Sequence, residues 1–157
     1  YLCIIKTFIV MKKTLIIIAS LLAFAVVASA QPRALGVRAG YGGELSYQHG
    51  LGSASFLEVD LGWTVGSINA AAAYDFSLTN LGPFGLYAGP AADIWLVSAN
   101  SESNGAIGLG AGAQVGLEYF FDAIPLQISL DWRPMFNLIP ATGFGWQSLA
   151  LGLRYAF

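Results

Sequence analysis

The sequence has little charge and almost no cysteine. Only 10% of the 157 residues are charged, and the single cysteine, Cys3, stands near the start of the chain. All three lysines lie before residue 14, so the remaining chain carries four arginines against nine acidic residues. We therefore expect no disulfide in the folded domain and, without a basic patch, no nucleic-acid partner.

Long apolar runs are also missing after residue 30. The one such run, Leu15 to Val27, follows the charged start Met11-Lys12-Lys13 and precedes Ala28-Ser29-Ala30. A charged start, a short apolar core and a small-x-small site are the three parts of a secretory signal peptide. The core is also too short to span a bilayer as a helix. The sequence therefore predicts three segments, an upstream extension over 1–10, a cleaved signal peptide over 11–30, and a mature domain over 31–157.

In the predicted mature domain, large apolar residues alternate with small or polar ones at every second position, most strictly at the end of the chain. Between 147 and 157 the odd positions after Gln147 are Leu or aromatic, while the even positions are small residues and Arg154. Such alternation indicates a strand whose two faces meet different environments. These eleven residues, tilted as barrel strands are, would span about 28 Å, close to the apolar band of a membrane barrel.

Seven more alternating segments precede the last one, separated by turn residues. They cover residues 34–41, 45–51, 55–63, 67–78, 83–97, 106–120 and 125–133. Without a membrane helix, any membrane span must be a closed barrel, because lipid offers no partner to unpaired backbone groups. We predict an all-β, eight-stranded, antiparallel up-and-down transmembrane barrel. Its longer connections are expected over 97–105 and 134–143, and Pro90 should disturb the ladder of the fifth strand.

The leader, the eight segments and the ending Gly152-Leu-Arg-Tyr-Ala-Phe157 resemble the small eight-stranded outer-membrane β-barrel proteins of Gram-negative bacteria, the OmpA/OmpX type. The resemblance implies a location in the cell outer membrane, with outer-membrane lipid around the barrel. It also implies the barrel-insertion machinery as a partner in assembly, and Tyr155 and Phe157 match the insertion signal of that family.

The inward-facing positions of the predicted barrel collect most of its charged residues. An eight-stranded barrel is only wide enough for its own side chains, and an unpaired charge inside it would be costly. We therefore favour a lumen filled by a paired charge network over a polar pore or a metal site, with Phe56, Trp95 and Trp146 adding bulk inside. The predicted lumen network comprises Arg38, Glu58, Asp60, Asp75, Glu118, Asp131, Arg133 and Arg154.

Aromatic residues on the opposite, outward face fall at two levels. Amphipathic rings favour the membrane interface, so the levels are interpreted as aromatic girdles. The predicted periplasmic girdle is Tyr47, Tyr74, Phe76, Tyr119, Tyr155 and Phe157, and the outer girdle is Tyr41, Trp63 and Trp132.

Candidate catalytic and cofactor groups are few. Glu58 and Asp60 share a face, which suits acid/base work or calcium, but nothing completes a ligand set. Ser46 and His49, a candidate esterase pair, are an odd number apart and so face opposite sides of one strand. The glycines over 108–116 lack dinucleotide-loop spacing and instead predict an inner wall with room for large neighbours. We expect no enzyme activity, no cofactor and no metal.

Several functions are compatible with this pattern. The first is a structural or interaction protein of the outer membrane, with the polar loop 98–105 as the place for an external contact whose partner the sequence does not identify. The alternative is a small channel or binding barrel for a small or apolar ligand. Lesser alternatives are a lipid-modifying enzyme and a soluble periplasmic lipocalin-like barrel, in which the faces would be reversed. Periodicity alone does not choose between the two orientations, but the girdles and Phe157 favour the membrane.

Overall fold

The computed structural model describes residues 31–157 except for 41, 65, 98–104 and 147. The predicted upstream extension and signal peptide, Tyr41 of the predicted outer girdle and most of loop 98–105 therefore lie outside the described residues. Pro32–Phe157 form one compact unit. Within the part of the chain that the structure describes, no helix has the length and hydrophobicity to cross a membrane.

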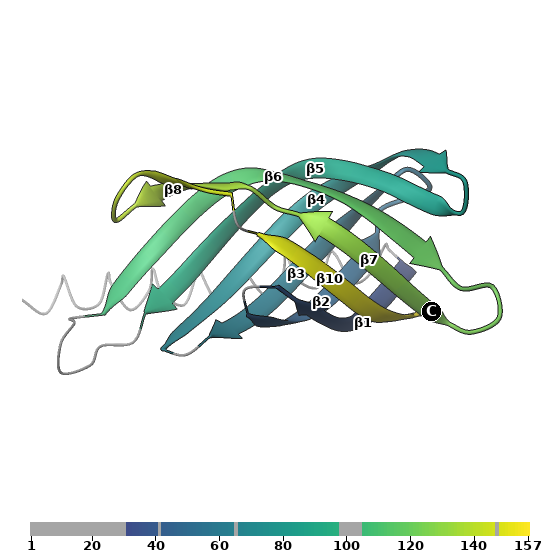
Figure 1. Cartoon of the computed structure of the whole chain (residues 1–157), viewed down its shortest axis with the longest axis horizontal. Helices are drawn as coiled ribbons and strands as arrows, with labels where there is room; N and C mark the ends of the chain where they lie inside the picture. Colours follow the sequence, from purple (N-terminus) through teal and green to yellow (C-terminus); the bar gives the residue numbers. More distant parts are fainter. Residues whose placement is uncertain (1–30, 41, 65, 98–104, 147) are drawn as a thin grey trace, which may run out of the picture. The chain divides into compact units, whose positions relative to one another are not determined.

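The described residues form a single layer of strands (Figure 1). In chain order these are β1 (Gln31–Ala39), β2 (Gly43–Gly50), β3 (Ser55–Thr64), β4 (Ser67–Leu81), β5 (Phe84–Val97), β6 (Ala106–Phe120), β7 (Leu126–Trp132), β8 (Met135–Ile139), β9 (Gly143–Gly145) and β10 (Leu149–Ala156).

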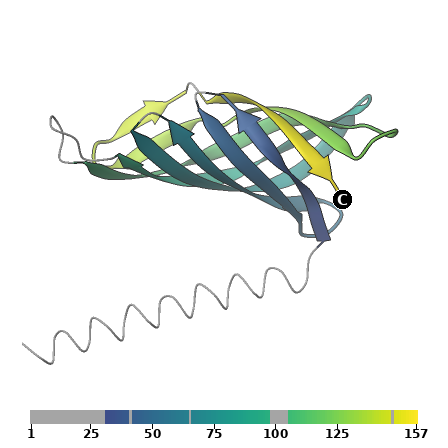
Figure 2. The same ribbon diagram turned by 90° about the horizontal axis from the view of Figure 1, so that it is seen from below.

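The layer closes on itself as an eight-membered ring. Its spatial order is β5-β4-β3-β2-β1-β10-β7-β6, and β5 also pairs with β6. The first and last strands pair antiparallel, from Ala34 with Ala156 to Ala39 with Leu151, as Figure 2 shows for the dark β1 beside the yellow β10. The predicted all-β, eight-stranded antiparallel barrel is thus confirmed among the described residues.

The predicted long connection over 134–143 is wrong. β8 lies there and continues the line of β7, pairing with β6 from Met135 opposite Gly112 to Ile139 opposite Leu109. β9 then folds back on β8. The sequence misleads because Pro134 has no N–H and looks like a strand end. Its carbonyl nevertheless accepts a hydrogen bond from the Ala113 N–H at 3.2 Å, so the pairing continues past it.

Pro90 interrupts the pairing of β5 on one side only. The β4–β5 register runs to Ala73 opposite Ala91 and resumes at Phe76 opposite Ala88, leaving a gap at Pro90. The missing N–H of proline explains this gap. On the other side Pro90 keeps its place opposite Ala113 in β6. β4 also extends to Leu81, three residues beyond the predicted end, after a register shift between Ser77 and Thr79.

The two faces of the barrel differ as the alternation predicts. Along β10, Leu149, Leu151, Leu153 and Tyr155 are exposed, while Ala150, Gly152 and Arg154 are buried. The same division holds for the other barrel strands, whose buried positions include arginine, acidic and amide side chains and whose exposed positions include large apolar ones. The interior is therefore polar and the exterior apolar.

Glycines on β6 make room for large side chains on β5, as the sequence predicts. Gly108 stands opposite Trp95, and Gly116 stands opposite Tyr87. A Cβ atom at Gly108 would collide with the Trp95 indole, and one at Gly116 would collide with the Tyr87 ring. Small and large residues thus fill the interior as complementary pairs, which is how narrow barrels are packed.

We predict that Gly116→Ala destabilises the barrel by about 1–3 kcal/mol, because overpacking a filled interior displaces its neighbours. The new methyl would meet the Tyr87 ring and lie 2.8 Å from the Asp131 Cβ. Urea unfolding in detergent measures the effect. Gly145→Ala is the matched control, because its nearest atom lies at an ordinary 3.6 Å. Equal unfolding midpoints for the two variants would contradict the packing described here.

Candidate functional site

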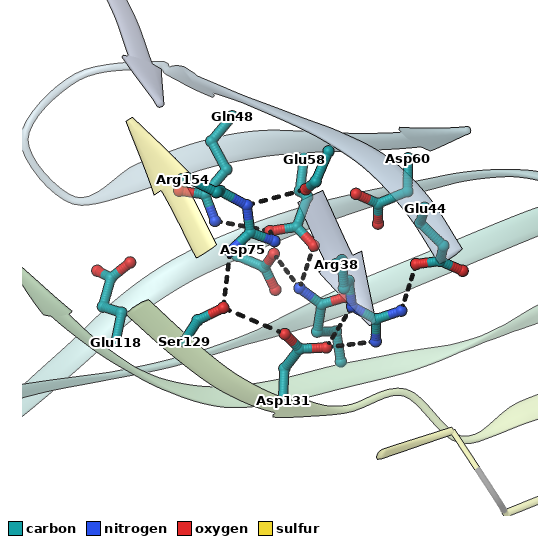
Figure 3. Close-up of polar contacts among 12 residues, drawn as sticks. Arg38, Glu44, Gln48, Glu58, Asp60, Asp75, Glu118, Ser129, Asp131 and Arg154 are labelled. Carbon is teal, nitrogen blue, oxygen red and sulfur yellow. Dashed lines mark hydrogen bonds and ion pairs between the residues drawn. The ribbon is translucent and has the colours of Figure 1, made fainter. Parts of the chain in front are cut away.

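The interior charge network occupies the lumen between the two ends of the barrel. We call the end where β10 finishes at Ala156 the terminal end, and the end where β5 finishes at Val97 the loop end. Figure 3 shows the network side chains reaching toward one another from several strands. All eight side chains of the predicted network are buried, namely Arg38, Glu58, Asp60, Asp75, Glu118, Asp131, Arg133 and Arg154.

Arg38 on β1 links two neighbouring parts of the wall. Its Nε donates to the Asp131 Oδ1 at 2.7 Å, and its Nη2 contacts the same carboxylate. Its Nη1 lies 2.5 Å from the Glu44 Oε2 on β2 (Figure 3). Because all three nitrogens are engaged, Arg38 ties β7 to β2 across the intervening β10 and β1. Glu44 was not among the predicted network residues and joins the network here.

Arg133 reaches across the lumen from the junction between β7 and β8. Its Nη2 lies 2.9 Å from the Glu58 Oε1 and also contacts Asp60, both on β3. Its Nε donates to the Gln114 Oε1 at 2.5 Å. A charge-assisted hydrogen bond of this kind is stronger than a neutral one. Arg133 thereby connects opposite walls of the barrel.

Arg154 on β10 completes the central part of the network. Its Nη2 lies 3.1 Å from the Glu58 Oε2. Its Nε donates to the Ser46 Oγ at 2.9 Å, and its Nη1 donates to the Ser129 Oγ at 2.7 Å. Figure 3 shows Arg154 between Glu58 and Ser129. Glu58 therefore receives two arginines, one on each carboxylate oxygen.

The two remaining acids are held mainly by amides. The Gln114 Nε2 donates to Asp75 at 3.1 Å, and Asp75 forms no salt bridge with any residue that the structure describes. Glu118 accepts a hydrogen bond from the Gln127 Nε2 at 2.7 Å and contacts the Arg33 guanidinium. The network thus extends to the terminal end, with fewer positive charges than negative ones.

Besides Glu44, two interior residues, Arg33 and Tyr87, are missed by the sequence analysis. Arg33 precedes the first alternating segment and has the parity of the outward face, yet its guanidinium lies 3.8 Å from the centre of the Phe56 ring. Tyr87 is fully buried, and its ring meets the Phe56 ring edge-on at 5.3 Å. The alternation over 83–97 puts Tyr87 on the inward face, opposite to the face of Leu86, so Tyr87 could have been predicted. Arg33 could not, because its position in the alternation belongs to the outward face.

The three bulky residues predicted inside behave differently. Phe56 is buried, and Trp95 is half-buried against Gly108. The prediction for Trp146 is wrong, because its side chain is 63% exposed. Trp146 follows β9, where the alternation is broken, and its carbonyl accepts a hydrogen bond from the Trp132 indole at 2.7 Å.

The predicted girdle residues do not all lie at an end of the wall. Trp63 is exposed at the loop end of β3, whereas Trp132 is exposed within the wall, because β8 continues the line of β7 beyond it to Ile139. At the terminal end, the rings form pairs, with Tyr74 and Phe76 centred 5.0 Å apart and Tyr155 and Phe157 5.5 Å apart. Tyr119 is half-buried and contacts both Phe84 and Phe121, which the prediction omitted. Tyr47 is half-buried as well.

The candidate catalytic groups do not assemble into a site. His49 is buried, and its Nδ1 lies 2.8 Å from the Tyr47 hydroxyl. Ser46 instead lies in the lumen and accepts a hydrogen bond from Arg154. Ser46 and His49 are therefore on opposite faces of β2. Among the residues that the structure describes, no group of three His, Cys, Asp or Glu side chains is arranged to hold a metal ion.

A scan against protein-family models, a search of curated proteins and a search of solved structures each found no match for this chain. Functional inference therefore rests on the geometry and charge of the barrel.

We predict that Arg133→Ala and Arg154→Ala each destabilise the barrel by about 3–5 kcal/mol, because each leaves the buried Glu58 and Asp60 carboxylates with a single arginine between them. Thermal unfolding in detergent, followed by circular dichroism, measures the loss. Asp122→Asn is the control, since Asp122 is exposed in the turn between β6 and β7. Unchanged thermal stability in both arginine variants would rule out a structural role for the network.

Proposed function

We propose that this chain is an integral outer-membrane β-barrel with a structural or interaction role, made with a cleaved signal peptide and without catalytic activity. The proposal rests on a distribution of polar and apolar side chains that is the opposite of the one in a soluble protein. Charged and amide side chains fill the interior, and large apolar side chains cover the outside.

The exterior is suited to lipid rather than water. Leu61, Ile68, Ile107 and Leu151 lie on four different strands, and each is more than half exposed. Monomeric soluble proteins rarely expose contiguous apolar surface of this extent. In the hydrocarbon of a bilayer the same side chains need no cover, and each of the eight ring strands is paired on both sides, while β9 outside the ring pairs only with β8. Outer-membrane lipid is therefore the proposed neighbour of the wall.

The soluble lipocalin-like alternative requires the opposite arrangement. Such a barrel holds its ligand in an apolar interior and presents polar side chains to water. Here Arg154 and Glu58 face inward, while Leu153 and Tyr155 face outward. The aromatic pairs at the terminal end also match an interfacial girdle. Tyr155 and Phe157, which are exposed and in contact at the end of β10, are the proposed signal for the barrel-insertion machinery.

The proposed lumen is sealed. Arg133 and Arg154 converge on Glu58 from different strands, and Phe56 and Tyr87 fill space toward the terminal end. A barrel of this size has room for its own side chains but not for a continuous water column. This arrangement favours a structural or interaction role over the channel alternative.

The location can be tested by expressing the full chain with its leader in a Gram-negative host and separating the membranes. We expect the protein in the outer-membrane fraction, migrating faster on a gel when unheated than when boiled, because the closed barrel stays folded in detergent at room temperature. The same chain without residues 11–30 is the control and should remain in the cytoplasm. A soluble periplasmic product with no mobility shift would contradict the proposal.

The sealed lumen can be tested by planar-bilayer recording of the purified protein. We expect no discrete conductance steps, since ion pairs close the lumen. A heat-denatured sample at the same detergent concentration controls for detergent leaks. Reproducible steps of constant size, absent from that control, would support the channel alternative instead.

A further inference from the structure

A cavity of about 470 Å³ lies at the loop end of the barrel, next to the outermost arginines of the network. Its wall draws on β1, β2, β3, β4, β5, β8, β9 and β10, so barrel strands surround it, but it is partly open. We call it the loop-end cavity and consider the six lining residues that carry its chemistry, namely Arg38, Glu44, Asn69, Asp93, Trp95 and Arg133.

The two arginines at this cavity are already neutralised. Arg38 pairs with Glu44 and Asp131. Arg133 pairs with Glu58 and Asp60. Two positive charges therefore face four carboxylates, and Glu58 is shared with Arg154. An anionic ligand would have to compete with these buried ion pairs, so the charge balance of the cavity favours a cation.

Asp93 is the acid in this wall that lacks an arginine. It forms no salt bridge with a described residue, and its Oδ1 is buried without a hydrogen-bond partner. The carboxylate lies against Gly110, where a side chain would collide with it. Asp93 as a whole is only half-buried and lines the cavity, so a ligand there can reach its carboxylate group, although Oδ1 is covered.

Trp95 lies next to Asp93 on the same face of β5. Residues two apart on a strand point to the same side, and both line the cavity. The Trp95 ring occupies the space that a side chain at Gly108 would need. Indole is the aromatic group that attracts cations most strongly. Asn69, opposite Trp95 on β4, adds a polar group to the rim.

We propose that the loop-end cavity binds a small organic cation, an ammonium group on a short carbon chain. The ammonium donates hydrogen bonds to Asp93 and lies at the face of the Trp95 ring, with Glu44 and Asn69 contributing polar contacts. A few convergent polar groups in a partly apolar cavity are the usual form of a small-ligand site. This site goes beyond the proposed function, which assigns the barrel no ligand.

The test uses the full chain, expressed with its leader and purified as a folded barrel in detergent. Butylammonium is titrated while the indole N–H signal of Trp95 is followed by NMR, with the signal assigned from Trp95→Phe. We expect a saturable shift fitting one site. Butyrate, butanol and potassium ions at equal concentrations should give no comparable shift, because each lacks either the positive charge or the carbon chain.

Asp93→Asn is expected to weaken butylammonium binding by about tenfold or more, which corresponds to at least one lost charge-assisted contact. Asp122→Asn removes the same charge from an exposed turn at the terminal end and should leave binding unchanged. The gel mobility of unheated samples verifies that each variant is folded. If Asp93→Asn fails to fold, Trp95→Leu takes its place. Its butylammonium binding is measured by isothermal titration calorimetry, because the indole signal is absent, and should be weaker for lack of the aromatic face.

Equal binding by folded Asp93→Asn, or an equal shift with butanol, butyrate or potassium, would overturn the proposal. These results are separable from the proposed function. A folded barrel that binds butylammonium but is absent from the outer membrane would contradict the location alone. An outer-membrane barrel without the Trp95 shift would contradict the cation site alone.

Discussion

The carboxylate of Glu58 is the interaction on which the interior depends. It accepts contacts from Arg133 and Arg154 and hydrogen bonds from Gln48 and Gln114, so residues from four other parts of the barrel meet on one buried group. Burying any of these charges alone would cost several kcal/mol, whereas together they satisfy one another. The network therefore does more than fill space, because it specifies which strands can face each other across the lumen.

Closure of the ring makes this arrangement possible. In a closed sheet every strand has two neighbours, so the backbone groups of the wall are paired and the side chains divide strictly into an inner and an outer set. The inner set is then confined to a narrow space, which explains why Gly116 stands beside Tyr87 and Gly108 beside Trp95. The outer set meets no other part of the barrel, which is why its apolar character is the main clue to the surroundings.

The alternation of apolar and polar residues predicts much of this fold, because it is a local property of each strand. It predicts which side of β10 is buried, the ring of eight strands and the inward position of Arg38 and Asp131. It fails where the period is broken. β8 follows a proline and resumes pairing through the Pro134 carbonyl, and Trp146 lies between two strand segments with no regular face. Arg33 enters the lumen against its parity, because a long side chain at a strand end is not bound by the pleat.

The number of ring strands, the composition of each face and the acidic excess of residues 31–157 are all readable from residue order, since each depends only on neighbours along the chain. The partners of the buried charges are not. Whether Arg133 meets Asp60 or Asp75 depends on the stagger between strands distant in sequence, which closure sets for the whole ring at once. The same stagger leaves Asp93 in the loop-end cavity without an arginine partner. Pairing across the lumen was therefore decided by the tertiary structure, because only a closed barrel brings those side chains within contact.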